Sequence, residues 1–395
     1  MRSRSVGRAL AWSIALAGCA PRDAVPPWRE RPGTAEGRVY YYQDDQGLRV
    51  FTAALSAEQP VARKVSVSAR AVVDRVVVER DVEIHEHTGN QATGHVHDDV
   101  DAVTSASVVV LGSDSLEKTR IEGTLGASVE STLAGAPLTV EPSVRVSSEH
   151  DYQAFSGRLS AFVELNQRNT VVSVFAGGGR DVSDPTTPPP GEASRWPATQ
   201  SRANGGFSVS QVLSKRLVLG FGGAASYQFG TLSNPYRRAL IVTSLFPERL
   251  PSSRLRFTGF ATVSAYAGWD TAVHLRAGGY ADSWGVLSFI PEIALVKELG
   301  GPLIALQYRR YQQTAADFYE LRYDTLPEYR TGDARLGRIV ENRPSVEVSV
   351  PVFGTPDDFG SLSVSANYHL MLLRYPDLER TVRGHVVALA IQGAY

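Results

Sequence analysis

The sequence has no apolar stretch long enough to form a membrane-spanning helix, although it runs to 395 residues. Such a helix needs roughly 18 or more consecutive apolar residues. It has one cysteine, so no disulfide can form within the chain, and its net charge of -1 gives no excess of either sign to attract nucleic acid. If this chain enters a membrane, we therefore expect it to do so as β-strands.

Sequence signatures of common enzymes are also missing. There is no Gly-x-Ser-x-Gly nucleophile motif, no phosphate-binding glycine loop and no His-Glu-x-x-His metal motif. We expect that the protein is not an enzyme.

The last thirteen residues, 383–395, show a clear two-residue period. Val387, Leu389, Ile391 and Tyr395 form an apolar row, and the residues between them are small or polar. This period is typical of a β-strand whose faces meet different environments. The segment looks like the closing strand of an outer-membrane β-barrel, whose terminal aromatic residue is a recognition signal for the barrel-assembly machinery.

The same alternation recurs along the chain and predicts about sixteen strands, with fourteen as the alternative. The predicted strands are 37–43, 48–58, 62–80, 118–131, 138–149, 156–166, 170–180, 204–213, 217–231, 255–268, 272–282, 284–297, 302–313, 343–352, 361–373 and 382–395. A soluble β-sandwich would also alternate, but its strands average only about five or six residues. Short turns here alternate with long connections near 81–117, 181–203, 232–253 and 314–342, as in bacterial barrels. We therefore expect an all-β fold, an antiparallel up-and-down transmembrane β-barrel over residues 37–395, in the cell outer membrane.

The N-terminus is typical of an export signal. Arg2, Arg4 and Arg8 precede a short apolar segment, which predicts a lipoprotein signal peptide over residues 1–18. The run Leu16-Ala17-Gly18-Cys19 resembles a bacterial lipobox, which makes Cys19 a candidate for lipidation; cleavage after Ala20 is the alternative. Residues 19–36 are rich in proline, arginine and glycine and are expected to form a periplasmic tether.

Charged residues fall on the predicted inner row of the strands, several of them as neighbours on one strand. They are Arg70, Asp74, Glu141, Arg145, Arg158, Glu164, Arg254, Arg256, Arg276 and Glu347. One interpretation is a water-filled pore whose charges tune selectivity, because barrels of this size usually leave an aqueous channel. The other is a network of charges that ties the wall together across a narrow or plugged interior.

Half of the eight histidines lie in one insert, residues 83–99. A hairpin there would bring together the candidate metal ligands His85, His87, His95, His97, Asp98 and Asp99. Imidazole and carboxylate suit transition metals such as copper or zinc. The alternative is a solvated polar loop without a metal.

Several short motifs, in order, resemble a known family. They include Ser147-Ser148-Glu149-His150-Asp151-Tyr152, Ser233-Asn234-Pro235-Tyr236-Arg237, Thr314-Ala315-Ala316-Asp317-Phe318-Tyr319 and Asp333-Ala334-Arg335-Leu336. Together they are similar to the Gram-negative family of unknown function DUF3570, over most of the chain from about residue 37. The resemblance implies an outer-membrane barrel without an established activity, and gene neighbours of the family suggest periplasmic redox partners. The histidine-rich insert is not part of the family pattern.

These observations favour a channel or transport component for small solutes in the outer membrane. The alternative is a surface metal-binding or scaffold barrel that uses the histidine-rich loop and is linked to a periplasmic redox system. In either case the expected partners are outer-membrane lipid and the barrel-assembly machinery, and not nucleic acid.

Overall fold

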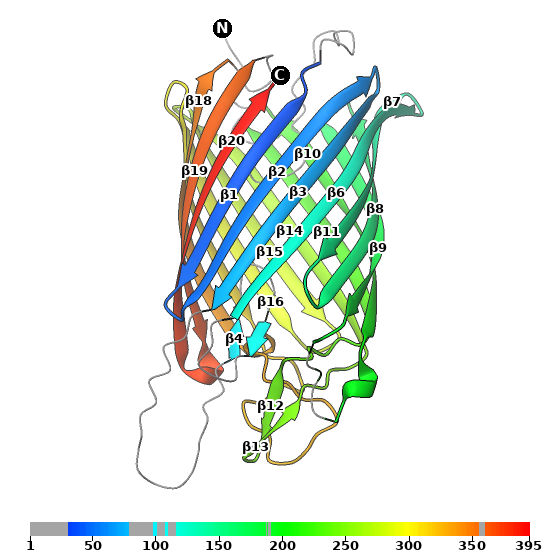
Figure 1. Cartoon of the computed structure of the whole chain (residues 1–395). Helices are drawn as coiled ribbons and strands as arrows, with labels where there is room; N and C mark the ends of the chain where they lie inside the picture. Colours follow the sequence, from blue (N-terminus) through cyan, green and yellow to red (C-terminus); the bar gives the residue numbers. More distant parts are fainter. Residues whose placement is uncertain are drawn as a thin grey trace.

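The computed structural model describes residues 31–78, 98–100, 107–109, 116–186, 188, 191–354 and 360–395. Sixteen antiparallel strands form one closed barrel (Figure 1). They are β1 (Thr34–Asp44), β2 (Leu48–Ala62), β3 (Val65–Val78), β6 (Leu116–Leu133), β7 (Ala136–Ser148), β8 (Tyr152–Leu165), β9 (Thr170–Ser183), β10 (Ala198–Ser214), β11 (Leu217–Gly230), β14 (Ser253–Gly268), β15 (Thr271–Asp282), β16 (Leu287–Glu298), β17 (Leu303–Gln313), β18 (Ile339–Phe353), β19 (Ser361–Tyr375) and β20 (Arg380–Ala394). The prediction of sixteen strands is confirmed, and the alternative of fourteen is excluded.

The barrel closes through its first and last strands. β1 pairs with β20 in antiparallel register from Thr34↔Ala394 to Asp44↔Gly384. Beyond the strands, the backbone N–H of Gly33 donates to the carbonyl of Tyr395 at 2.8 Å, and the N–H of Tyr395 donates back at 2.9 Å. Because every strand is paired on both sides, the sheet has no open edge, as a bilayer requires.

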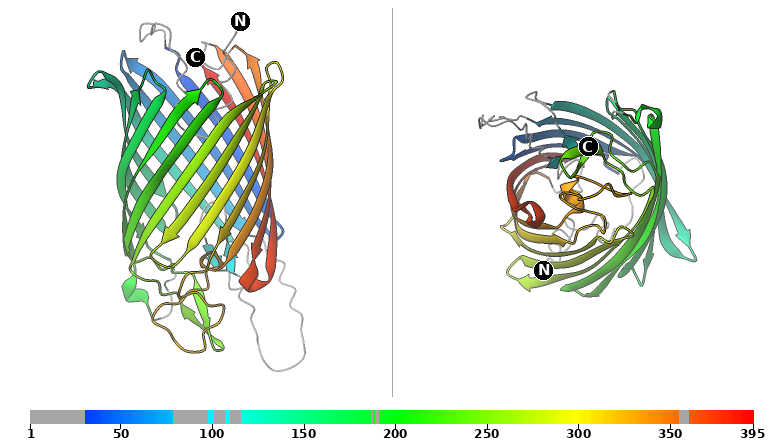
Figure 2. Two further views of the ribbon diagram at one scale, coloured as in Figure 1. Left: turned by 180° about the vertical axis from the view of Figure 1, so that it is seen from behind. Right: turned by 90° about the horizontal axis from the view of Figure 1, so that it is seen from below.

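The two ends of the barrel differ in the length of their connections. At one end, which we call the turn end, the strands are joined by short turns such as 63–64, 134–135 and 215–216, and β1 begins and β20 ends there (Figures 1 and 2). The opposite end, the loop end, carries the long connections 184–197, 231–252 and 314–338 and the one between β3 and β6. This agrees with the alternation expected from the sequence.

Several short strands and 3-10 turns lie at the loop end. They are β4 (Asp98–Val100), β5 (Ser107–Val109), β12 (Arg238–Ile241), β13 (Ser244–Pro247), and the 3-10 turns η2 (Ala193–Arg195), η3 (Ala334–Leu336) and η4 (Pro376–Leu378). β4 pairs with β5, and β12 with β13, as two small sheets separate from the wall. No helix among the described residues is long and apolar enough to cross a bilayer.

Some strands begin closer to the loop end than the alternation indicated. β10 begins at Ala198 rather than 204 because its first residues continue the ladder with β9, out to the pair Ala198↔Ser183. β18 begins at Ile339 rather than 343, paired with Gln313 at the end of β17. Backbone pairing thus extends both strands beyond the residues whose side chains alternate between apolar and polar.

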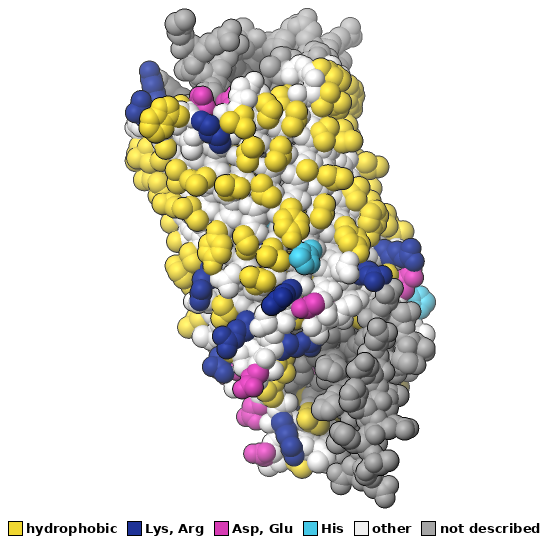
Figure 3. Space-filling view, turned by 90° about the vertical axis from the view of Figure 1, so that its left-hand side faces the viewer, with side chains coloured by type: hydrophobic (Ala, Val, Ile, Leu, Met, Phe, Trp, Pro, Cys, Tyr) yellow, Lys and Arg dark blue, Asp and Glu magenta, His cyan; other side chains and the backbone are white. Residues whose placement is uncertain are grey.

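The outer face of the wall is apolar. Large side chains such as Leu55, Leu125 and Leu389 are 67%, 62% and 54% exposed. Figure 3 shows hydrophobic side chains covering a broad band of the barrel, with charged side chains gathered mainly nearer the loop end. Because soluble proteins rarely expose a continuous apolar surface of this size, the band is the surface expected to contact lipid.

Candidate functional site

The ten charged residues of the predicted inner row all lie on the inward-facing side of their strands. On β3, for example, Asp74 and its neighbours Val72 and Val76 are buried inside, whereas Val73 between them is 42% exposed outside. The same alternation places the others inside: Arg70, Glu141, Arg145, Arg158, Glu164, Arg254, Arg256, Arg276 and Glu347.

Most ion pairs on the inner wall run between strands and not along them. Asp74 accepts a hydrogen bond from Nε of Arg120 on β6 at 2.7 Å and another from Oγ1 of Thr52 on β2 at 2.6 Å. Asp74 does not pair with Arg70, which the sequence places on the same strand. Residues four apart on a strand lie about 13 Å from each other, whereas direct neighbours on adjacent strands lie about 5 Å apart.

Other inward charges also pair across strands: Arg145 with Glu122 of β6, Arg202 with Asp181 of β9, Arg254 with Asp282 of β15, and Arg309 with Glu341 of β18. Two pairs run along one strand, Arg343 with Glu341 on β18 and Arg38 with Glu36 on β1. Glu164 instead pairs with Arg168 of the following turn, at 2.9 Å. Much of the inner charge therefore stabilises the wall, which is the second of the two interpretations raised by the sequence.

The middle of the interior nevertheless remains open to solvent. Arg70, Arg158, Asn204 and Thr258 face inward from four different strands, and all four are exposed. Because the wall is closed around them, the water that reaches these side chains must lie inside the barrel.

The inner face is covered at the loop end. Tyr42, Val50, Val78 and Met371 face inward there, yet they are only 1–3% exposed. Nearby, Ala334 of η3 packs against the inward-facing Leu373 and Tyr375, and β4 contacts η3. The end-on view in Figure 2 shows the orange segment around η3 within the ring of strands. The connection between β17 and β18 thus enters the barrel and narrows it.

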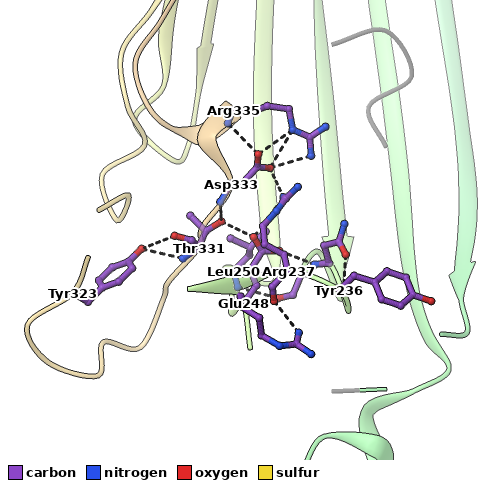
Figure 4. A network of polar contacts seen from close by, with 11 residues as sticks. Tyr236, Arg237, Glu248, Leu250, Tyr323, Thr331, Asp333 and Arg335 are labelled. Carbon is purple, nitrogen blue, oxygen red and sulfur yellow. Dashed lines mark hydrogen bonds and ion pairs between the residues drawn. The ribbon is translucent and has the colours of Figure 1, made fainter. Parts of the chain in front are cut away.

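A buried ionic cluster fixes this connection in place (Figure 4). Arg237, from the connection between β11 and β14, forms ion pairs with Asp333 and with Glu248. Glu248 also accepts from Oγ1 of Thr331 and, at 2.7 Å, from the backbone N–H of Asn234. The side chains of Arg237, Glu248 and Asp333 are 3%, 0% and 8% exposed. We call Arg237, Glu248, Thr331 and Asp333 the loop lock.

The pKa values of the two carboxylates of the loop lock shift in opposite directions. Burial raises the pKa of Glu248, although Arg237 acts in the opposite direction. Burial alone would also raise the pKa of Asp333, but Arg237 and Arg335 outweigh it and hold that pKa below its usual range. Asp333 is therefore the firmly charged member of the cluster.

Sequence reasoning did not find the loop lock as a cluster. Arg237 and Asp333 each lie in a motif that resembles DUF3570, but 96 positions separate them and neither lies on an alternating strand. Cross-strand partners such as Arg120, Glu122 and Asp282 were missed for a simpler reason. Their inward direction follows from alternation, but their contacts depend on strand register, which the sequence does not display.

Two predicted sites lie outside the described residues. Cys19 belongs to the N-terminal segment, and His85, His87, His95 and His97 belong to the connection between β3 and β6. Asp98 and Asp99 begin the short strand β4. In the part of the chain that the structure describes, no group of three or more histidine, cysteine or acidic residues is arranged to hold a metal ion.

Comparison with solved structures finds outer-membrane barrels. A bacterial polysaccharide outer membrane secretin matches with a TM-score of 0.50 and 10% identity, over 93% of this chain and 99% of its own. The ferric enterobactin receptor PfeA of Pseudomonas aeruginosa matches with a TM-score of 0.43 and 10% identity, over 87% of this chain and 54% of its own, so the chain spans about half of that receptor's length. OccAB3 of Acinetobacter baumannii matches with a TM-score of 0.37 and 11% identity, over 93% and 99%. At these identities the likeness concerns the fold alone, and the likeness to the secretin, together with the closed barrel, points to the outer membrane.

No curated protein sequence matches the chain. A family model described as a protein of unknown function (DUF3570) matches residues 28–369.

Proposed function

Since the chain belongs to DUF3570, a family described only as of unknown function, we propose its role from its own geometry: an outer-membrane channel or transport component for small solutes. In this proposal the outer band contacts membrane lipid, the turn end faces the periplasm and the loop end faces the outside, as in other bacterial barrels. The role is transport and not catalysis.

The solvent-exposed inner wall supports the proposal most directly. Arg70, Arg158, Asn204 and Thr258 are polar, inward-facing and exposed at the middle of a closed wall of sixteen strands. Barrels of 16 to 18 strands usually enclose an aqueous channel. A barrel that served only as a scaffold would not need water at this depth.

The covered loop end limits the size of the solutes that could pass through the proposed channel. η3 and the residues around it pack on the inner wall, where Leu373 and Tyr375 are 6% and 4% exposed. Only small solutes would pass this segment, or the segment would have to move. The connection between β17 and β18 therefore acts as the constriction of the proposed channel.

Planar-bilayer recording of refolded protein tests this role. Gln313 and Ile339 face each other across β17 and β18, so residues 315–337 can be replaced by a short Gly-Ser turn without changing the wall. We expect small conductance steps from the natural chain and larger steps from the shortened one. If neither protein conducts, although both show the heat-dependent gel mobility of a folded barrel, the proposed channel is wrong.

A further inference from the structure

Two arginines on the inner wall are stacked on phenylalanine rings. Cζ of Arg158, on β8, lies 3.8 Å from the ring centroid of Phe175 on β9. Cζ of Arg276, on β15, lies 4.5 Å from the ring centroid of Phe260 on β14. A guanidinium above an aromatic face is attracted by the ring and keeps its N–H edges free to donate in its own plane.

Glycines on two strands between them let the rings come close to the wall. A Cβ added at Gly206, on β10, would lie 2.6 Å from Cε1 of Phe175, and one at Gly222, on β11, would lie 2.9 Å from Cε1 of Phe260. Real Cβ atoms do not come this close to their neighbours, so any side chain at either position would displace the ring above it. Each phenylalanine ring therefore lies against a glycine, and we call Gly206 and Gly222 the glycine floor of the stacks.

The two stacks converge on one place. Phe175 reaches over β10 from one side and Phe260 reaches over β11 from the other, and β10 and β11 are paired neighbours. Gly206 stands opposite Ala224, two residues from Gly222, so the two glycines are diagonal neighbours about 7–8 Å apart. Both rings thus lie over one short stretch of wall, and each guanidinium lies against its own ring.

These two arginines differ from the paired arginines around them. Among the residues that the structure describes, neither Arg158 nor Arg276 forms an ion pair with a carboxylate; Nε of Arg158 donates only to Oγ of Ser160, at 3.1 Å. By contrast, Arg120, Arg145 and Arg254 each pair with an acidic residue. Both guanidiniums therefore keep N–H groups that no carboxylate of the described residues directly accepts from, although Glu292 stands opposite Arg276 in the ladder and Glu141 lies close enough to Arg158 to interact with its charge.

Solutes inside the barrel can reach this charge. Arg158 is exposed and Arg276 is half-buried. Asn204, two residues before Gly206 on β10, and Thr258, level with Gly206 on β14, are also exposed. Asn204 adds an amide that can donate, and Thr258 adds a hydroxyl.

We propose that Arg158 and Arg276 form an anion-binding site on the inner wall for a small polyvalent anion that carries phosphate or carboxylate groups. Planar guanidiniums match both groups through paired hydrogen bonds, and two separate guanidiniums favour a ligand with two acidic groups over one with a single group. The site deepens the proposed function, because it lies on the path that a solute would follow.

The opposing interpretation is that the stacks only pack the wall. Arg70 provides the matched control, because it is also inward-facing and exposed and forms neither an ion pair nor a ring contact within the described part of the chain. If simple positive charge in the interior binds anions, Arg70 will contribute as much as the stacked pair.

Calorimetry on refolded protein in detergent, with pyrophosphate as the probe and phosphate for comparison, tests the site. We compare the natural chain with Arg158→Gln, Arg276→Gln, the double variant and Arg70→Gln, each shown to be folded by its heat-dependent gel mobility. Losing one charge-assisted contact is expected to weaken pyrophosphate binding by about tenfold or more, whereas Arg70→Gln should leave it nearly unchanged. Phosphate should bind the natural chain more weakly than pyrophosphate.

The outcomes separate this site from channel activity. Selective loss of pyrophosphate binding in the stacked-arginine variants supports the site, whether or not the protein conducts in bilayers. Absence of pyrophosphate binding by the natural chain overturns the site even if the protein conducts. Equal loss in Arg70→Gln, or binding unchanged in the double variant, also overturns it.

Discussion

Arg237 donates a hydrogen bond to Oδ2 of Asp333 and so joins two connections that lie far apart in the sequence. Both side chains are almost completely buried, at 3% and 8% exposed. An ion pair shielded from water in this way is costly to break, because removing one partner leaves the other charge buried without compensation. The position of η3 inside the barrel therefore depends on this contact.

Asp333→Asn should release the connection between β17 and β18. Arg237 and Arg335 would both lose their ion pair with Asp333, at a local cost of about 3 kcal/mol, or more than a hundredfold in the opening equilibrium of the connection. The measurement is trypsin cleavage after Arg322, which is exposed and precedes the buried Tyr323. Asp377→Asn is the control, because Asp377 pairs with Arg338, whose side chain is 60% exposed, and surface pairs contribute little. Equal cleavage rates in the two variants would argue against the loop lock.

Protonation of Glu248 should stabilise the connection between β17 and β18 as the pH falls. Its pKa is raised in the folded protein, so the folded state takes up a proton at a higher pH than the unfolded state does. By linkage, stability then rises as the pH falls from neutral through the folded pKa. Asp333 has a lowered pKa and acts in the opposite direction, but only as the pH falls below the usual aspartate range near about 4.

Hydrogen exchange at residues 318–338, compared between pH 7 and pH 5, would measure this effect after correction for intrinsic rates. We expect protection to increase at pH 5 in the natural chain and to remain level in Glu248→Gln. Protection that decreases at pH 5 in the natural chain would show that the sign assigned to Glu248 is wrong.

Alternation predicted the wall because one physical rule governs all sixteen strands. Each strand has one face toward lipid and one toward the interior, so rows such as Val387, Leu389 and Ile391 repeat throughout. The glycine floor was less visible. Gly206 and Gly222 fit the small inner row, but nothing in their own sequence shows that a ring from the neighbouring strand lies over them.

Alternation along strands cannot predict contacts between connections that are far apart in the sequence. The loop lock needs Arg237, Glu248 and Asp333 to meet at one point, and that meeting is set by how two long connections fold over the mouth of the barrel. Loop residues follow no simple period, so their direction is fixed by tertiary packing alone.

The histidine-rich insert remains a prediction, since its histidines lie outside the described residues. If His85, His87, His95 and His97 bind metal, calorimetry with Cu(II) and Zn(II) should give heats that vanish when all four are replaced by alanine. Binding should also weaken below about pH 6, where imidazoles take up protons. Identical heats from the natural chain and the variant would leave the insert as a solvated polar loop.

Leu159 and Thr258 offer a direct test of which face meets lipid. Both lie near the middle of the wall, Leu159 pointing outward with 53% exposure and Thr258 pointing inward and exposed to the interior. Leu159→Arg should reduce the free energy of unfolding in lipid vesicles by about 2–4 kcal/mol, the cost of an arginine at the bilayer midplane. Thr258→Arg should cost little, because its guanidinium would lie in water, and guanidinium-chloride unfolding of both variants in the same vesicles gives the comparison. Similar losses in the two variants would mean that the apolar band does not lie in a bilayer, and a soluble assembly packed around the barrel would then have to explain the exposed leucines.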